Sequence, residues 1–275
     1  MPSPIDRIVD RFGTEGVRRF GEIPGLILPS QVGPYFHSLR EEPCDLPAYA
    51  AFAERRLPDG EWQGWARLGS DRACELVVSP EGQVGTVLLE AAEHPFGLVN
   101  SSVGAFATGL VDLDVLVGEL GEATAASEAE AALRRFERRL RESDPAALSD
   151  REGWWSRVLD DLRDSTAVET YAAFEVVDDH GEKKVFTGSG GLAVHAEEQL
   201  WSRLSAAGVR AGQVARVYTE LEACALPGHY CALWLALTFP EATVTHSFPY
   251  GDTAQSRAEG IRRLRAAVAE RKRQG

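Results

Sequence analysis

Four side chains in the C-terminal part of the sequence are of the types that bind and use a metal ion. His195 and Glu197 lie two residues apart in GGLAVHAEEQLW, and Cys224 and Cys231 follow in VYTELEACALPGHYC. One His and two Cys are three ligands that suit Zn²⁺ with an open fourth position. Zinc in such a site brings the pKa of its water close to neutral. Glu197 is near enough to His195 to move a proton without binding the metal.

The sequence around these residues predicts strands and helices in alternation. Strands are expected at 169–177, 183–188, 213–222 and 242–251, and helices at 195–208, 228–239 and 254–273. The resulting order β-β-α-β-α-β-α is typical of a three-layer α/β domain with helices covering a sheet. Because strands precede both ligand-bearing helices, the two helix starts are expected at the same end of the sheet.

Other interpretations of the same residues remain open at this point. A His at a helix start often caps the helix, and Cys in an apolar segment often packs as a small hydrophobic side chain. Within ALPGHY, between the two cysteines, Pro227 and Gly228 predict a turn that leaves Cys231 at the helix start. His229 is an alternative third ligand in place of Cys231. The joint occurrence of His-x-Glu and a Cys pair in one domain-sized segment favours the metal site.

The segments HAEEQLW, VYTELEACALPGHYC and VTHSF together resemble the nucleic acid/nucleotide deaminases of bacterial polymorphic toxin systems, over about residues 166–275. The resemblance implies a cytidine-deaminase-like domain in which His195, Cys224 and Cys231 bind zinc and Glu197 is the general acid/base. The sequence departs from the family pattern in two ways. Ala223 stands where the family has Pro, and six residues separate the cysteines instead of two.

The resemblance also implies hydrolytic deamination of a nucleobase, and we favour cytosine in single-stranded DNA. A free-nucleotide deaminase is an alternative. The aromatic and imidazole side chains expected as candidates for base contact are Phe186, Trp201, His229, Tyr230 and His246. The basic C-terminal helix is a candidate for phosphate contact, although a solvated face is the simpler interpretation.

The first part of the chain predicts a different kind of domain. RLGSDRACELVVSPEGQVGTVLLE indicates two strands, at 72–78 and 83–90, joined by the turn SPEG. FGLVNSSVGAFATGL indicates a strand, a Ser cap and a helix, and a Trp-bearing helix capped by Ser149 closes the region. Residues 1–164 resemble the SUKH immunity-protein superfamily, in particular its fourth subgroup, SUKH-4. This resemblance implies an α+β domain that binds and neutralises a toxin.

Charge separates the two predicted domains, 1–164 and 165–275. The chain has 275 residues and a net charge of −13, and residues 1–165 hold 29 acidic and 17 basic side chains against 13 and 12 in the remainder. An acidic surface suits a basic toxin partner, because complementary charge speeds association. If the metal site were a relic, the chain would be a non-catalytic immunity or interaction protein. Four cysteines and the lack of an apolar leader or membrane span predict a cytoplasmic protein.

Overall fold

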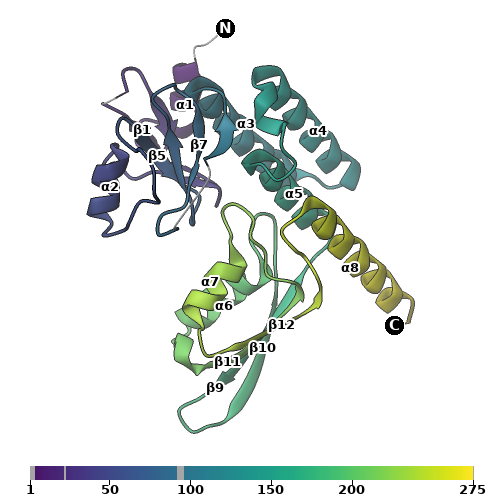
Figure 1. The fold of residues 1–275 in the computed structure, drawn as a ribbon. Helices are drawn as coiled ribbons and strands as arrows, with labels where there is room; N and C mark the ends of the chain where they lie inside the picture. The colour runs from purple at the N-terminus through teal and green to yellow at the C-terminus, as the bar shows by residue number, and fades with distance from the viewer. Residues whose placement is uncertain (1–3, 22, 92–95, 275) are drawn as a thin grey trace. The chain divides into compact units, whose positions relative to one another are not determined.

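The computed structural model describes residues 4–21, 23–91 and 96–274 of the chain. The chain divides into two compact units, Met1–Leu159 and Asp160–Gly275 (Figure 1). Each helix in the described ranges is too short or too polar to cross a membrane.

The N-terminal unit is built on an antiparallel sheet with the strand order β3-β4-β5-β6-β7-β8. A separate antiparallel ribbon joins β1 to β2. The strands are β1 (Val17–Arg19), β2 (Ile27–Pro29), β3 (Gln31–Val32), β4 (Phe36–His37), β5 (Ala66–Ser70), β6 (Glu75–Val78), β7 (Val84–Val87) and β8 (Gly97–Asn100). The helices are α1 (Pro4–Phe12), α2 (Leu46–Phe52), α3 (Val103–Glu122), α4 (Ala126–Ser143), the 3-10 turn η1 (Pro145–Leu148) and the first part of α5 (Trp154–Ala167).

A buried polar network holds β8, η1 and α5 together in this unit. Trp155 is fully buried, and its Nε1 donates to Asn100 Oδ1 at 2.9 Å. Asn100 Nδ2 donates in turn to Asp144 Oδ2 at 2.9 Å. The Trp155 ring also packs on Phe106 and Phe136. The buried side chains of Asn100, Asp144 and Trp155 thus satisfy one another, as polar groups in a stable core do.

Most elements predicted for this unit are present, with one error in a helix start. The two predicted strands correspond to β6 and β7, and Ser102 caps α3 by accepting from the Ala105 backbone N–H at 3.2 Å. Ser149 as a helix cap is wrong, because α5 begins at Trp154. A turn closed by Gly153 N–H donating to Asp150 O at 3.2 Å occupies the intervening residues.

The C-terminal unit contains a four-stranded sheet with the order β10-β9-β11-β12, in which β11 and β12 are parallel and the other pairs are antiparallel. Its elements follow the predicted order. They are β9 (Tyr171–Val177), β10 (Lys183–Ser189), α6 (Ala196–Ala206), the 3-10 turn η2 (Ala211–Gln213), β11 (Val214–Leu221), α7 (Cys231–Thr238), β12 (Thr243–Phe248) and α8 (Ala254–Gln274).

Helices α6 and α7 cover one face of this sheet (Figure 1). Phe174 and Val217, on neighbouring strands, are fully buried and pack with Leu200 of α6 and Leu235 of α7. Strand side chains alternate between faces, so Glu220, three residues after Val217, points to the other side. Arg271 of α8 meets it there, with Nη2 2.7 Å from Oε1. The unit is therefore a mixed α/β structure with helices on both sides of its sheet.

Candidate metal centre

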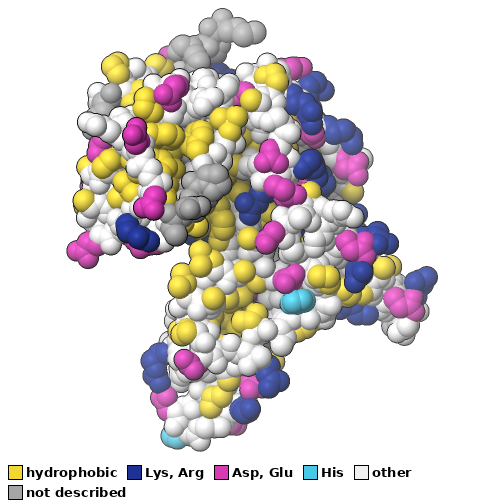
Figure 2. All heavy atoms as spheres, in the orientation of Figure 1, with side chains coloured by type: hydrophobic (Ala, Val, Ile, Leu, Met, Phe, Trp, Pro, Cys, Tyr) yellow, Lys and Arg dark blue, Asp and Glu magenta, His cyan; other side chains and the backbone are white. Residues whose placement is uncertain are grey.

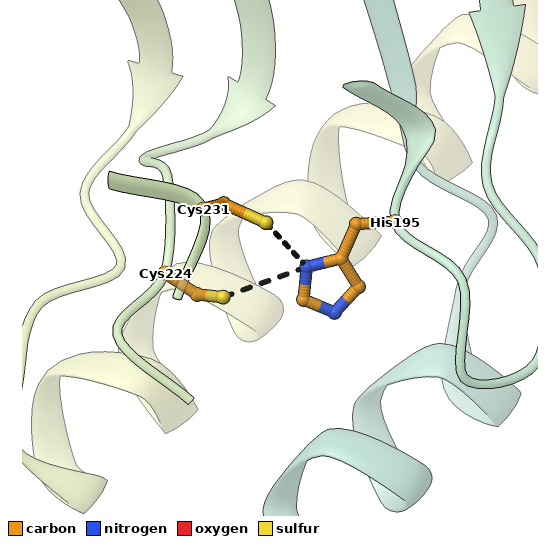
Figure 3. A group of neighbouring side chains, drawn as sticks. All are labelled: His195, Cys224 and Cys231. Atoms are coloured by element: carbon orange, nitrogen blue, oxygen red, sulfur yellow. Dashed lines mark hydrogen bonds between the residues drawn. The ribbon is translucent and has the colours of Figure 1, made fainter. Parts of the chain in front are cut away.

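Three side chains from three separate elements converge on one point (Figure 3). His195 is the N-cap residue of α6, Cys231 is the first residue of α7, and Cys224 lies in the loop after β11. The Nδ1 atom of His195 is 3.2 Å from Cys231 Sγ and 3.5 Å from Cys224 Sγ. Both cysteines are buried and neither forms a disulfide. The structure thus places the three predicted ligands side by side.

A tight turn explains how six intervening residues still bring the two thiols together. The Tyr230 backbone N–H donates to Leu226 O at 3.0 Å, and Gly228 adopts a φ of +81°, which favours glycine. The Ala232 N–H then donates to Cys224 O at 3.0 Å. The loop residues fold out between the cysteines, so that the wider spacing does not separate the sulfur atoms.

The two thiols have opposite electrostatic environments. Burial alone raises the pKa of Cys224, but a hydrogen bond with Cys231 and the charge of His195 outweigh burial and lower that pKa well below its usual value. Burial and the adjacent Cys224 raise the pKa of Cys231. One of the two sulfur atoms is therefore prepared to be a thiolate, the form that binds metal.

The second ring nitrogen of His195 is held by Asp161, a buried residue of α5. His195 Nε2 lies 2.8 Å from Asp161 Oδ1. A carboxylate on one nitrogen fixes the proton there and leaves the other nitrogen free for a metal. Asp161 therefore orients the His195 ring so that Nδ1 faces the two sulfur atoms.

His229, the alternative ligand, lies in the same network but faces carboxylates instead of the thiols. Its Nδ1 is 2.7 Å from Glu198 Oε2, its Nε2 is 3.2 Å from Asp161 Oδ2, and its ring stacks on that of His195 with centroids 3.9 Å apart. Burial lowers its pKa, but Asp161 and Glu198 outweigh burial and raise the pKa to about 9. The geometry favours Cys231 over His229 as the third ligand.

The donor set fits zinc. In a tetrahedral site with Zn–N near 2.05 Å and Zn–S near 2.3 Å, ligand N and S atoms lie about 3.6 Å apart. The two N–S distances here, 3.2 and 3.5 Å, are close to that value, and the three ligand atoms all lie within 4.8 Å of one another. Asp161, His195 and His229 also lie within metal-binding range of one another. Only the His195–Cys224–Cys231 group, however, offers the softer sulfur donors that select zinc.

Glu197 follows His195 by two residues, in the first turn of α6. Its side chain is 6% exposed, and burial raises the pKa of its carboxyl group. Glu197 also lines the cavity described next. A buried carboxyl group two residues from a candidate metal ligand has the environment that acid/base chemistry needs.

A cavity of about 330 Å³ opens beside the metal ligands within the C-terminal unit. His195, Glu197 and Cys224 form one wall. The other lining residues come mainly from the C-terminal half of α5, the start of β9, the end of β11 and the segment before α6, together with Tyr250 and Ile261. The volume is at the lower end of the range for small-molecule sites, so the cavity is large enough for a single heterocycle.

The predicted base-contacting residues do not line this cavity. Phe186 of β10 is paired with Phe174 of β9. Trp201 packs on Phe174 and Phe239, and His246 is exposed on β12. His229 and Tyr230 are likewise not among its lining residues, and the aromatic side chains that do line it are Tyr171 and Tyr250. The cavity lies at the strand ends, away from these residues, and their contact with a base stays a prediction.

Asp161→Asn is expected to weaken zinc binding by roughly 10–100-fold, the usual cost of losing a carboxylate behind a ligating His. The amide of Asn cannot accept hydrogen bonds from both imidazoles through two charged oxygens. Zinc affinity of the full chain is measured by competition with a chelator. Asp160→Asn is the control, because Asp160 pairs with Arg257 and Arg163. Equal zinc affinity in native protein and Asp161→Asn contradicts the role given to Asp161.

Asp164 makes the stability of this unit depend on pH. Burial raises its pKa from 3.8 to about 6, although Tyr250 Oη donates to its Oδ2 at 2.6 Å. Between about pH 4 and 6 the unfolded chain loses this proton while the folded chain keeps it, so stability falls as pH rises, by about 3 kcal/mol in total.

Asp164→Asn is expected to remove that loss. Its free energy of unfolding in urea should therefore increase relative to that of the native protein as the pH rises from 4.5 to 7.5. Asp179→Asn, at an exposed carboxylate, is the control. A stability difference between Asp164→Asn and native protein that is constant across this range overturns the assignment.

Family models match both parts of the chain. Residues 29–161 match the model described as SUKH-4 immunity protein, and residues 167–267 match the model described as Xanthomonas-like deaminase. The two matches occur in the order that the sequence predicted. Searches of curated proteins and of solved structures found no match. The second match begins after Asp161, so the residue that holds His195 lies outside it.

Proposed function

We propose that this chain is a zinc-dependent hydrolytic deaminase of a nucleobase that acts in a bacterial toxin–immunity setting. Its two family matches, to a SUKH-4 immunity protein at residues 29–161 and to a Xanthomonas-like deaminase at residues 167–267, support this proposal. The observation that carries the proposal is the convergence of His195, Cys224 and Cys231 beside a cavity that Glu197 lines. A cytidine-deaminase-like fold for residues 165–275 is part of the proposal. The strand order β10-β9-β11-β12, with both ligand-bearing helices on one face, is consistent with it.

In the proposed reaction water adds to the ring carbon that bears the amino group, and ammonia leaves. His195, Cys224 and Cys231 would hold the zinc ion, which would supply a water activated at neutral pH. Glu197 would accept a proton from the attacking water and return it to the departing amine. Asp161 would hold the His195 ring with Nδ1 toward the metal position. Cytosine and water thus give uracil and ammonia, with no other reactant.

Cytosine is the base we propose, and the sequence favours single-stranded DNA as its carrier. The test is made on the full chain loaded with one zinc. Cytosine- and adenine-containing oligonucleotides, free bases, nucleosides and monophosphates are incubated with it, and uracil or inosine products are measured by mass. Uracil is the expected product. If inosine is the only product, the base is adenine and not cytosine. If a chain with one zinc gives no product from any of these substrates, the proposal is contradicted.

The N-terminal domain supports a second function, toxin binding, that needs no catalysis. Acidic side chains lie scattered over the face of this unit drawn in Figure 2, and residues 1–165 hold most of the chain's excess negative charge. We propose that residues 1–164 bind a basic toxin, since opposite charge speeds association. Association rates of the full chain with basic nuclease toxins, measured at low and high salt, test this. Rates that do not change with salt contradict a charge-guided partner.

A further inference from the structure

The cavity beside the metal ligands carries an excess of negative charge. Away from the metal-binding wall it is lined by Asp164, Glu169, Glu220 and Glu222. Among the described residues that line it, none is Lys or Arg. Arg271 reaches Glu220 at 2.7 Å and balances that one carboxylate. The remaining carboxylates accept from neutral donors, as Glu222 does from the Tyr250 backbone N–H at 2.9 Å and Glu169 from Tyr171 Oη at 2.8 Å.

The C-terminal end of α5 adds to the negative electrostatic potential in the cavity. Ser165, Thr166 and Ala167, in the last turn of α5, line the cavity, and the C-terminal end of a helix carries partial negative charge. The N-terminal end of α6, which would attract an anion, already has Glu197 and Glu198 in its first turn. A phosphate group placed in the cavity thus meets carboxylates and helix carbonyls without a basic side chain.

One wall residue has a hydrogen-bonding group without a partner. Thr219, near the end of β11, is 3% exposed, and its Oγ1 has no hydrogen-bond partner among the described residues. Buried hydroxyl groups are nearly always hydrogen-bonded. Thr219 shares its face of the sheet with Ala172, which packs beside α6, and it lines the cavity together with Glu197 of α6. A ligand in the cavity can supply the missing partner.

From these observations we infer that the cavity takes an unphosphorylated nucleobase or nucleoside, whose polar ring edge pairs with the Thr219 hydroxyl. This inference rests on the proposed deaminase function and replaces single-stranded DNA as the expected carrier of the base. The carboxylates exclude nucleotides and nucleic acid by repulsion of phosphate. At the effective dielectric of a protein surface, one like-charge contact near 6 Å lowers affinity by roughly 100-fold.

The test compares cytosine, cytidine, cytidine 5′-monophosphate and a single-cytosine oligonucleotide on the zinc-loaded full chain. Turnover is measured on the native protein, and binding is measured by calorimetry on Glu197→Gln, so that affinity is known without catalysis. We expect the nucleoside to exceed the monophosphate by roughly 100-fold in both measurements, with a smaller ratio at high salt because ions screen the repulsion. A monophosphate or oligonucleotide that is bound or deaminated better than the nucleoside overturns the inference and leaves the deaminase function standing. No binding and no turnover of any of the four overturns both.

Variants of the wall test the two parts of the inference separately. Thr219→Val is expected to raise KM for cytidine about 10-fold, the effect of one hydrogen bond, with a smaller change in kcat, and Thr219→Ser is expected to restore it. The double change Glu169→Gln and Glu222→Gln is expected to raise activity on the monophosphate. If the ratio of activity on cytidine to activity on the monophosphate stays at its native value in the double variant, exclusion of phosphate by charge is contradicted. An unchanged KM in Thr219→Val contradicts the hydroxyl contact.

Discussion

Glu197→Gln is expected to reduce deaminase turnover by roughly 10²–10⁴-fold, the usual contribution of a general acid/base, and to leave zinc content unchanged. Glutamine has the shape of glutamate but cannot accept or return a proton at neutral pH. The side chain is buried, lines the cavity and lies two residues after a metal ligand. Turnover is measured as product formed per zinc, so that a loss of metal is not mistaken for a loss of chemistry.

Glu175→Gln provides the matched control for this experiment. Glu175 is in β9 of the same unit but pairs with Lys183 at 3.0 Å, away from the cavity. Native rates are expected for the control. Turnover by Glu197→Gln within a few-fold of native protein would show that another group moves the proton.

Cys224→Ala is expected to remove zinc and, with it, several kcal/mol of the stability that the metal gives the folded chain. A ligand that binds only the folded state at 1,000 times its Kd stabilises by about 4 kcal/mol. Cys224 supplies one of three donors, and two donors alone hold zinc weakly. Zinc per chain and the free energy of unfolding are measured with and without a chelator.

The chelator separates loss of metal from damage to the core. With zinc present, native protein is expected to be more stable than Cys224→Ala by several kcal/mol. In chelator the difference is expected to shrink to about 1 kcal/mol, the packing value of one buried sulfur. Cys74→Ala, in the other unit, is expected to retain zinc. A stability difference of the same size with and without chelator would make Cys224 a packing residue.

The convergence of the three candidate ligands could be predicted from sequence because its signal is local. His195 and Glu197 are two residues apart, and Cys231 begins a helix that follows a strand, as helical periodicity indicated. The unusual cysteine spacing also had a local explanation, since Gly228 adopts the positive φ of a turn. Residue type, spacing and turn chemistry were therefore enough to place three ligands together.

Asp161 and the cavity could not be predicted in the same way, because their positions depend on contacts distant in sequence. Asp161 is 34 residues before the His195 that it orients, on a helix that the sequence assigned to the first domain. One signal was present: Asp161 stands three residues after Val158 and seven after Trp154, on the otherwise apolar face of α5. The position of Trp201 depended on distant contacts too, since its ring packs against the core of the unit and does not line the cavity.

Zinc analysis of the full chain, combined with X-ray absorption at the zinc edge, tests directly whether the chain binds zinc through Cys224, Cys231 and His195. We expect one zinc per chain with two sulfur ligands near 2.3 Å and two nitrogen or oxygen ligands near 2.0–2.1 Å, one of them from His195. Loss of one sulfur in Cys224→Ser would identify the source. A chain that takes up no zinc, or zinc without sulfur ligands, would contradict the account and favour a non-catalytic binding protein.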